Sequence, residues 1–384
     1  MSKVFIEEST LTSIGDAIRA KTGKSDLIPP GAMPTEIESI ETGGGGLPEE
    51  ALNITGNCDN RFWNGGWDWV IRDCGNKVIT KDIISAEKMF GYSKVEEIPF
   101  ELNFKANNSC KINNMFENCV NLKSIPKINN CQPINFMYFF QSCCNLRYLP
   151  DDIADWFDWT YINNAPNSSA GAMNSIFYYC CSLRSAPIDL LSHIGKNTSY
   201  GYGYFARGFY SCYCLDELVN LPLPYTSTWT SNAFGTSFNY TYRLKNLTFA
   251  LQENGLPIEM NWRSQTIDLY NCIGYGISIA DIIGHNSGIT ADKEVKDDAT
   301  YQALKNDPDW FTTKYEYSRY NHDSAVATIN SLPDTSAYLA TAGGTNTIKF
   351  YGRSGELTDG GAINTLTEEE IAVAAAKGWT VSIS

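Results

Sequence analysis

A motif that recurs along the middle of the chain constrains the fold more than any other feature of the sequence. It reads Met-Phe-x-x-Cys-x-x-Leu-x-x-Ile-Pro, and its clearest copies occupy residues 115–126, 139–150 and 176–187. An earlier copy at 89–99 is one residue shorter and lacks the cysteine. Motifs that recur at a period of roughly 20–50 residues are typical of solenoids, in which each repeat packs only on its neighbours. The motif therefore predicts a stack of repeats.

The repeats become looser and unequally spaced toward the C-terminus. The later copies are recognised by Phe209, Cys212, Leu215, Leu218 and Leu221, and a last remnant by Phe234, Leu244 and Leu247. The third clear copy follows the second after 37 residues, whereas the second follows the first after 24. This longer step indicates an insertion around 155–169, and a second insertion covers 200–205. Insertions in solenoids form loops, often on the binding face.

The first segment, residues 1–42, predicts a small helical docking module. Leu11, Ile14 and Ile18 form the apolar stripe of a short amphipathic helix. Residues 43–50 are a Gly-rich linker. So few apolar positions cannot hold a core, so we expect the module to dock on a partner or on copies of itself. A leader without fixed structure is the alternative.

Three further regions follow the linker. We interpret 51–88 as the N-terminal cap of the solenoid, 89–247 as the solenoid with its aromatic insertions, and 248–384 as a C-terminal solenoid region with an inserted loop at 291–322 and a terminal cap. The tryptophans of 51–88 either seal the end of the core or form a carbohydrate platform, and we favour sealing.

Local patterns predict secondary structure at both ends of these regions. Alternating apolar residues predict a strand over 51–55. The C-terminal region predicts strands over 265–270, 345–351 and 379–383, and helices over 324–332 and 368–376. Thr367 and Glu370 form a capping box at the start of the last helix.

The cysteines have a structural explanation. Cys119, Cys143 and Cys180 share one motif position, and equivalent positions stack in a solenoid, so these thiols should pack in the interior as small apolar groups. The chain has 12 Cys but no two Cys-x-x-Cys pairs at zinc spacing. We therefore predict no metal and no cofactor. A disulfide formed after cell lysis and a metal site are the alternatives.

Net charge limits the partners. The formal charge is −14, which disfavours nucleic acid and anionic membranes. The sequence has no apolar run long enough for a transmembrane helix and no secretory signal at its start, so we expect the protein to fold in a cytoplasm and not to insert into a membrane.

The aromatic insertions are the strongest candidates for a binding surface. Aromatic residues make up 13% of the chain, more than a core of this size needs. Sugar rings stack on the faces of tryptophan and tyrosine side chains. Aromatic residues in an insertion are not required to pack in the core. The candidate residues are Trp156, Trp159, Tyr161, Tyr200, Tyr202 and Tyr204. Packing of the loops themselves is an equally weighted alternative.

No catalytic constellation is evident. His193, His285 and His322 lie in unrelated segments without a nucleophile motif nearby. Pairs of aspartates at glycosidase-like spacing are expected by coincidence among 43 acidic residues. We predict no catalytic residues and no enzymatic activity.

The repeat motif resembles the BspA-type leucine-rich repeat of bacterial surface proteins and phages. The stretches 11–23 and 33–40 are similar to the N-terminal module of structural proteins of tailed phages that infect Gram-positive bacteria, and 366–379 is similar to the C-terminus of phage proteins of this repeat type. The resemblance implies an α/β repeat, an irregular leucine-rich-repeat-like solenoid with a small N-terminal helical docking module. It also implies a virion component and no catalytic residues.

Three functional hypotheses follow. The first is a tail, baseplate or fibre protein that docks on other virion proteins through 1–42, binds a host-surface glycan or protein, and forms a homo-oligomer. The second is an architectural head-fibre or decoration protein without a ligand. The third is a cell-wall polysaccharide depolymerase.

Overall fold

The structure is a computed structural model in which the chain forms two compact units, Met1–Asn53 and Ile54–Ser384. It describes residues 52–164, 172–193, 205–222, 234, 236–241, 243–250, 265–270, 272, 322–351 and 366–383. The predicted docking residues Leu11, Ile14 and Ile18, the linker 43–50 and the loop 291–322, apart from His322, lie outside the described residues.

Short strands and a few helices make up the described residues of the second unit and its boundary with the first. The strands are β1 (Asn53–Asn57), β2 (Ile79–Ser85), β3 (Leu102–Asn103), β4 (Ser109–Cys110), β5 (Ile128–Asn129), β6 (Gln132–Pro133), β7 (Glu217–Leu221), β8 (Asn246–Phe249), β9 (Thr266–Asp268), β10 (Asn346–Phe350) and β11 (Trp379–Ile383). The α-helices are α4 (Asp68–Cys74), α5 (Thr160–Asn164), α6 (Ile188–Leu191), α11 (His322–Ser331), α12 (Ser336–Ala342) and α13 (Glu368–Ala376), and the 3₁₀ helices are η1 (Trp63–Gly65), η2 (Gly75–Lys77) and η3 (Ile153–Trp156).

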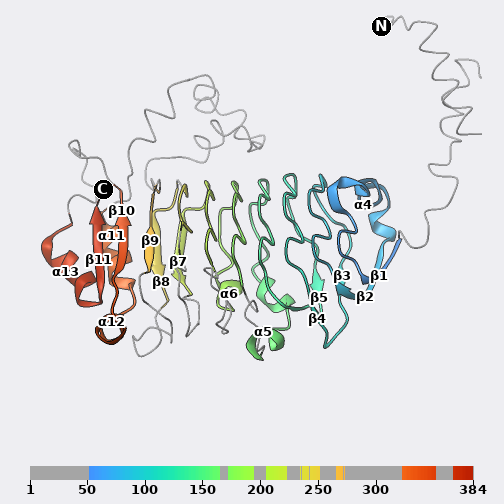
Figure 1. Ribbon diagram of the computed structural model, residues 1–384. Helices are drawn as coiled ribbons and strands as arrows, with labels where there is room; N and C mark the ends of the chain where they lie inside the picture. The colour runs from blue at the N-terminus through green and yellow to red at the C-terminus, as the bar shows by residue number, and fades with distance from the viewer. Residues whose placement is uncertain are drawn as a thin grey trace, which may run out of the picture. The chain divides into compact units, whose positions relative to one another are not determined.

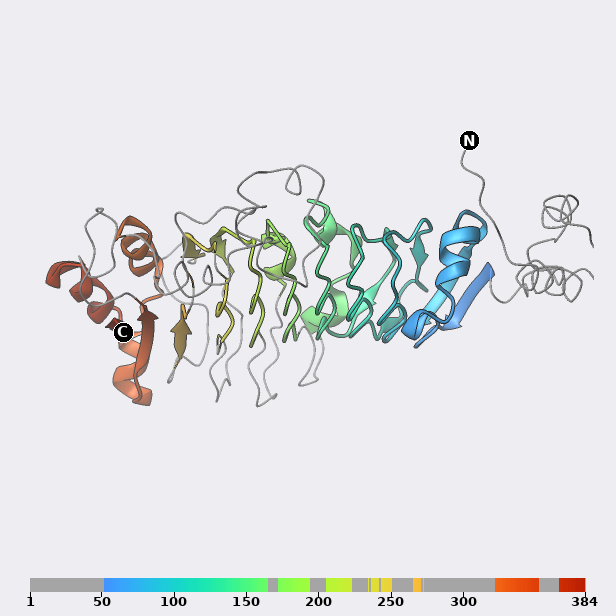
Figure 2. The ribbon, with the colours of Figure 1, turned by 90° about the horizontal axis from the view of Figure 1, so that it is seen from above.

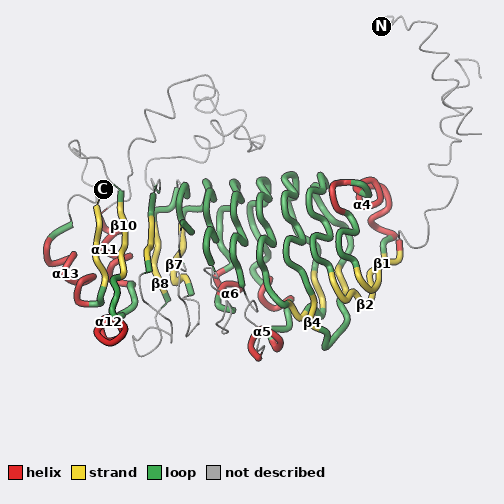
Figure 3. Tube along the Cα trace, in the orientation of Figure 1, coloured by secondary structure: helices red, strands yellow, loops and turns green. Residues whose placement is uncertain are grey.

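Successive turns of the chain, here called coils, pair in parallel. Strand β3 pairs with β5, β4 with β6 and β7 with β8, and β9, β10 and β11 form a sheet in the order β11-β10-β9. Parallel strands cannot be joined by a tight hairpin, so the chain makes a full circuit between paired segments. Figures 1 and 2 both show the coils side by side in chain order. Figure 3 shows most of each coil as loop, because the strands are short.

A regular backbone hydrogen bond joins each coil to the next at one motif position, the phenylalanine position. Phe90 N–H donates to the Met115 carbonyl at 2.9 Å, and Phe140 N–H donates to the Ile176 carbonyl at 3.0 Å. Phe62, Phe116, Phe177 and Phe209 make the same bond to the residue before the next coil's phenylalanine position. Equivalent residues therefore stack although insertions separate them in sequence.

The side chains at the phenylalanine position form a continuous interior stack. Ring centroids of consecutive members lie 5.2–5.8 Å apart and their planes are within 10° of parallel. The stack consists of Phe62, Phe90, Phe116, Phe140, Phe177 and Phe209, all at most 1% exposed. This apolar column is the main support of the coils, since burying one such side chain stabilises by about 1.5–3 kcal/mol.

A second interior column lies three residues further on, at the cysteine position. The thiols of Cys119, Cys143 and Cys180 are buried as predicted, and Cys212 is buried at the same position of a later coil. Each also donates a hydrogen bond to the carbonyl of the preceding coil's phenylalanine, for example Cys143 Sγ to the Phe116 oxygen at 3.1 Å. The cysteine position therefore requires a small side chain that can donate a hydrogen bond. A small apolar side chain, as expected from the motif, is not sufficient.

The hydrogen bond made at the cysteine position identifies two further copies of the repeat, which the motif alone does not place correctly. Phe238, and not Phe234, occupies the phenylalanine position, because Thr241 lies three residues later and its hydroxyl donates to the Phe209 carbonyl at 2.9 Å. In the next coil, Cys272 Sγ donates to the Phe238 carbonyl at 3.1 Å, three residues after Leu269. Threonine for cysteine and leucine for phenylalanine obscure these copies in the sequence.

Each coil turns sharply around the phenylalanine position. The residues two before and two after it have positive φ, as at Asn114 and Asn118 (57–58°) and at Ser175 and Tyr179 (55–60°). Asn tolerates this left-handed conformation, whereas other L-residues are strained by about 1–2 kcal/mol. The same backbone turn thus recurs with different side chains on its outer edge.

The predicted secondary structure at both ends is confirmed with small shifts. The N-terminal strand appears as β1, and α4 buries Val70 and Ile71 beside the first coil. At the other end, α11, β10, α13 and β11 coincide with the predicted elements. The capping box is present: Thr367 Oγ1 accepts from Glu370 N–H at 3.2 Å, and Glu370 Oε2 accepts from Thr367 N–H at 2.8 Å.

Candidate functional site

Tyrosine rings on the outer edge of consecutive coils form a continuous strip, here called the tyrosine row. Its members are Tyr178, Tyr179, Tyr210, Tyr240, Tyr270 and Tyr351. The centroid distances along the row are 5.2 Å from Tyr178 to Tyr210, 5.2 Å from Tyr210 to Tyr240 and 5.5 Å from Tyr240 to Tyr270. Tyr351, directly after β10, extends it at 5.2 Å from Tyr270. Neighbouring rings are therefore in contact along the whole row.

The turn geometry places these rings. Tyr178 and Tyr210 follow the phenylalanine position by one residue, and Tyr179 and Tyr240 follow it by two. Tyr179 and Tyr240 have φ of 60° and 61°, the recurrent left-handed turn. Paired strands lie about 4.8 Å apart, so equivalent edge residues fall within the 4.5–7 Å range of aromatic pairs.

The row is accessible from solvent. Tyr179 is 36% and Tyr270 39% exposed, and the other members are partly exposed. A monomeric protein rarely exposes contiguous apolar surface unless that surface contacts something. Tyrosine offers a rigid ring and one hydroxyl at low entropic cost, which suits a recognition surface.

The phenol groups of Tyr178, Tyr210 and Tyr351 remain protonated at neutral pH, because their pKa values are raised. Burial raises the pKa of Tyr178 and of Tyr210. Burial, followed by the nearby Asp268 carboxylate, raises the pKa of Tyr351 to about 12. The Tyr210 hydroxyl can therefore donate a hydrogen bond to a ligand oxygen atom, whereas the Tyr178 and Tyr351 hydroxyls already bond to Tyr179 and to Asp268.

One buried amide within the edge strengthens the case for a ligand. Asn239 occupies, in its coil, the position that Tyr210 and Tyr270 occupy in the coils on either side. Asn239 is 8% exposed, and its Oδ1 has no hydrogen-bond partner within the described part of the chain. A buried acceptor left unpaired costs about 1–3 kcal/mol, so it calls for a donor. Because this oxygen is shielded from solvent, an ordered water or a ligand hydroxyl that reaches it would supply one.

The aromatic residues of the first insertion pack against the coils. Trp156 is only 7% exposed, and Lys127 Nζ lies over its ring at 4.3 Å from the centroid. Trp159 Nε1 donates to the Ala154 carbonyl at 2.9 Å, and its ring stacks on His193 at 3.9 Å. This placement favours the packing alternative for both tryptophans.

The remaining candidate residues are placed only in part. Tyr161 lies in α5 and is partly exposed. Tyr200, Tyr202 and Tyr204 lie outside the described residues. Trp156 and Trp159 thus belong to the packed insertion and not to the tyrosine row.

The sequence contained a signal for the tyrosine row that the sequence analysis did not use. Tyrosines directly follow the motif phenylalanine in the copies at Phe177 and Phe209. These tyrosines occupy variable positions of the motif, and not its insertions, and they mark the start of the row. Its continuation through Tyr240 depends on recognising Phe238 as the phenylalanine position.

The described residues contain little reactive chemistry. They include no group of three His, Cys, Asp or Glu side chains that could hold a metal ion. Burial raises the pKa of the thiols at the cysteine position far above the usual value, so these cysteines are poor nucleophiles. A cavity of about 240 Å³ opens beside α6, and its lining includes the Asp151 and Asp189 carboxylates. No helix in the described ranges is long and apolar enough to cross a membrane.

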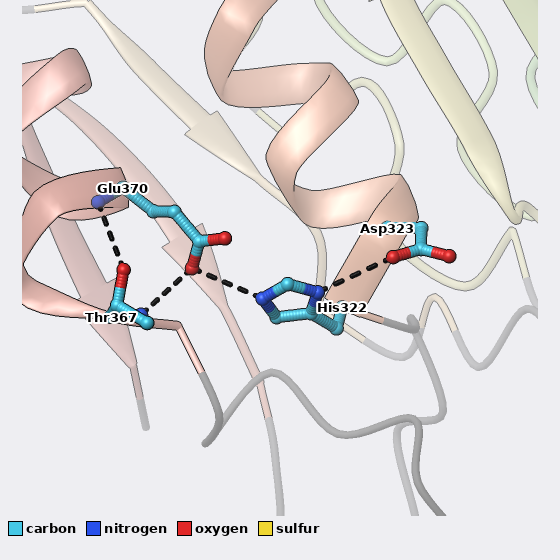
Figure 4. Close-up of polar contacts among 4 residues, drawn as sticks. All are labelled: His322, Asp323, Thr367 and Glu370. Atoms are coloured by element: carbon cyan, nitrogen blue, oxygen red, sulfur yellow. Dashed lines mark hydrogen bonds and ion pairs between the residues drawn. The ribbon is translucent and has the colours of Figure 1, made fainter.

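A cluster of polar side chains joins two helices near the C-terminus. His322 Nε2 contacts Glu370 Oε2 at 3.0 Å, and His322 Nδ1 contacts Asp323 Oδ1 at 3.4 Å (Figure 4). Glu370 is also the capping-box residue of α13 (Figure 4). The cluster therefore ties α11 to the start of α13.

Comparison of this chain with known protein families, with curated proteins and with solved structures gives no match.

Proposed function

We propose that the chain is a non-enzymatic virion structural protein of the tail, baseplate or fibre that displays a leucine-rich-repeat-like solenoid for binding the host surface. The observation that carries the proposal is the tyrosine row, a contacting series of partly or fully exposed rings on stacked coils. The resemblance of the repeat motif and of both ends of the chain to phage structural proteins supplies the virion context. In this proposal, residues 1–42 dock on other virion proteins.

The chemistry of the row favours a glycan. The C–H face of a sugar ring stacks on tyrosine, and the protonated hydroxyl of Tyr210 can donate to a sugar oxygen. The overall negative charge disfavours anionic surfaces as the target and is compatible with neutral saccharides.

A binding assay with cell-wall glycan purified from Gram-positive bacteria tests the proposal. We expect Tyr179→Ala combined with Tyr270→Ala to weaken binding of the full chain at least about tenfold, since truncating central aromatic contacts costs more than 1 kcal/mol. The matched control is Tyr148→Ala. Tyr148 is 56% exposed and outside the row, with the Arg184 guanidinium 6.0 Å from its ring centroid.

Two results would decide against the proposal. Equal weakening by Tyr148→Ala would show that the row is not the site. Absence of glycan binding by the unaltered chain, with the chain present in purified virions by mass spectrometry, would instead support the architectural hypothesis. Absence of the chain from virions would remove the virion assignment itself.

A further inference from the structure

Two cysteines on adjacent coils share a site beneath the tyrosine row. Cys144 and Cys181 both lie four residues after the phenylalanine position of their coils. Their Sγ atoms point to the same acceptor, the Tyr179 carbonyl oxygen, at 3.6 Å from Cys144 and 3.3 Å from Cys181. One thiol can instead donate its single hydrogen to the other sulfur, and this contact shifts both pKa values. The stacking of the coils therefore holds these sulfur atoms side by side.

The two thiols differ in the properties that matter for oxidation. Cys144 is partly exposed, whereas Cys181 is 4% exposed. The hydrogen bond from Cys181 lowers the pKa of Cys144, and that same bond together with burial raises the pKa of Cys181. An accessible thiol with a lowered pKa beside a buried partner is the arrangement of an attacking and a resolving cysteine.

We propose that Cys144 and Cys181 are an oxidation site, which forms a disulfide between adjacent coils when the protein meets a low-molecular-weight disulfide such as oxidised glutathione. The Cys144 thiolate attacks one glutathione sulfur, the glutathione S–S bond breaks, and the first glutathione leaves as a thiolate that takes up a proton. Cys181 then loses its proton and attacks Cys144 Sγ, which releases the second glutathione. Two protein thiols are oxidised and one glutathione disulfide is reduced to two thiols.

A second close pair provides an internal comparison. Cys110 Sγ and Cys131 Sγ are 3.0 Å apart, but these residues are 1% and 0% exposed. Reaction with a dissolved disulfide requires access to the attacking thiolate, and burial raises the pKa of Cys131. In the folded chain, Cys144–Cys181 is therefore oxidised first although Cys110 and Cys131 are in direct contact.

Peptide mapping of the full-length chain tests the proposal. The reduced, folded protein is treated with oxidised glutathione, its free thiols are alkylated, and tryptic peptides are analysed by tandem mass spectrometry. Cleavage leaves Cys144 in the peptide 128–147, Cys181 in 148–184 and Cys110 in 106–111. We expect a Cys144–Cys181 linkage between the first two peptides before any linkage that includes 106–111.

Three variants make the assignment sharp. Cys181→Ser should leave Cys144 captured as a stable mixed disulfide with glutathione, and Cys144→Ser should abolish both products. Cys143→Ser is the matched control, because its hydroxyl can still donate to the Phe116 carbonyl and it leaves the reactive pair intact; the linkage should persist. A main product that joins Cys143 to Cys180 or Cys110 to Cys131, or a Cys144 that stays singly glutathionylated in the unaltered chain, would overturn the proposal.

Discussion

The outer edges of two neighbouring groups of coils differ although their interiors are alike. In the coils of Phe116 and Phe140, the two residues after the phenylalanine position are polar: Glu117 and Asn118, then Gln141 and Ser142. Glu117 Oε2 accepts from Asn114 Nδ2 at 2.9 Å, so the turn is closed by side-chain hydrogen bonds. From Phe177 onward, the same edge carries the tyrosine row.

The interior does not change at this boundary. The ring of Phe140 stacks on Phe116 at 5.8 Å on one side and on Phe177 at 5.6 Å on the other. The cysteine position keeps its donor to the preceding carbonyl on both sides. Stacking thus fixes the interior positions, whereas the edge positions are free to vary, and that freedom allows a binding surface to occupy part of the edge.

The largest predicted effect tests whether the two interiors are equivalent. Phe116→Ala and Phe177→Ala should each lower the free energy of unfolding by about 3–5 kcal/mol, the usual cost of truncating a buried phenylalanine. Both side chains are fully buried. Urea unfolding of the two variants measures the losses. If one variant loses less than half as much free energy of unfolding as the other, the interiors of the two groups of coils are not equivalent.

A smaller effect tests the donor column where the sequence obscures it. Thr241→Val removes the hydroxyl that donates to the Phe209 carbonyl and should cost about 0.5–1.5 kcal/mol, the usual net contribution of one hydrogen bond, because the carbonyl keeps its bond from the Cys212 N–H. Thr241→Cys restores a donor of the kind that Cys212 supplies in the preceding coil, so its loss should be smaller. Equal losses in urea unfolding would show that shape, and not hydrogen bonding, decides this position.

The edge itself can be altered across the boundary. Gln141 lies one residue after its phenylalanine position, as Tyr178 does in the next coil, so Gln141→Tyr should extend the tyrosine row into the polar group. An added aromatic contact is worth about 0.5–1 kcal/mol, or about threefold tighter glycan binding. Gln141→Ala should leave binding unchanged. Titration with the same cell-wall glycan compares the two, and weaker binding by Gln141→Tyr would count against a continuous row.

The smallest effect is a pH dependence confined to the end that carries the row. The hydrogen bond to Glu370 raises the pKa of His322, so its contribution to stability is present below pH 6.5 and is lost as pH rises through the raised pKa. The capping-box hydrogen bond from Thr367 lowers the pKa of Glu370, so that contribution is present above pH 4.5 and is lost as pH falls through the lowered pKa. The contact between His322 and Glu370 should be most stabilising between about pH 4.5 and 6.5.

Hydrogen exchange measures this dependence locally. α11 contacts β8, since Thr328 Oγ1 donates to the Leu247 carbonyl at 2.7 Å, so protection in β8, corrected for intrinsic exchange rates, should fall above pH 6.5. Strands β3 and β5 serve as the reference without such a dependence. His322→Gln should flatten the profile of β8. An unchanged profile in that variant would assign the dependence to other groups.

The sequence alone determined the interior of the coils and the secondary structure of the C-terminal end. Phenylalanine and cysteine recur at a fixed spacing because each must fill a place in a column, and columns tolerate few residue types. The capping box of Thr367 and Glu370 is likewise local, since both partners lie within one helical turn. Constraints that repeat along the chain or act within one helical turn can therefore be recognised in the sequence.

Only the tertiary structure decided which edge residues meet. Tyr179, Tyr210, Tyr240 and Tyr270 recur at intervals of 31, 30 and 30 residues, but they alternate between two positions of the turn, so the spacing alone does not show that their rings form one row. Their contacts arise because parallel pairing sets neighbouring coils about 4.8 Å apart whatever the length of chain between them. The same stacking brings Cys144 to Cys181 and buries Trp156. The register of the stacked coils, more than the insertions between them, therefore determines which residues form the candidate surface.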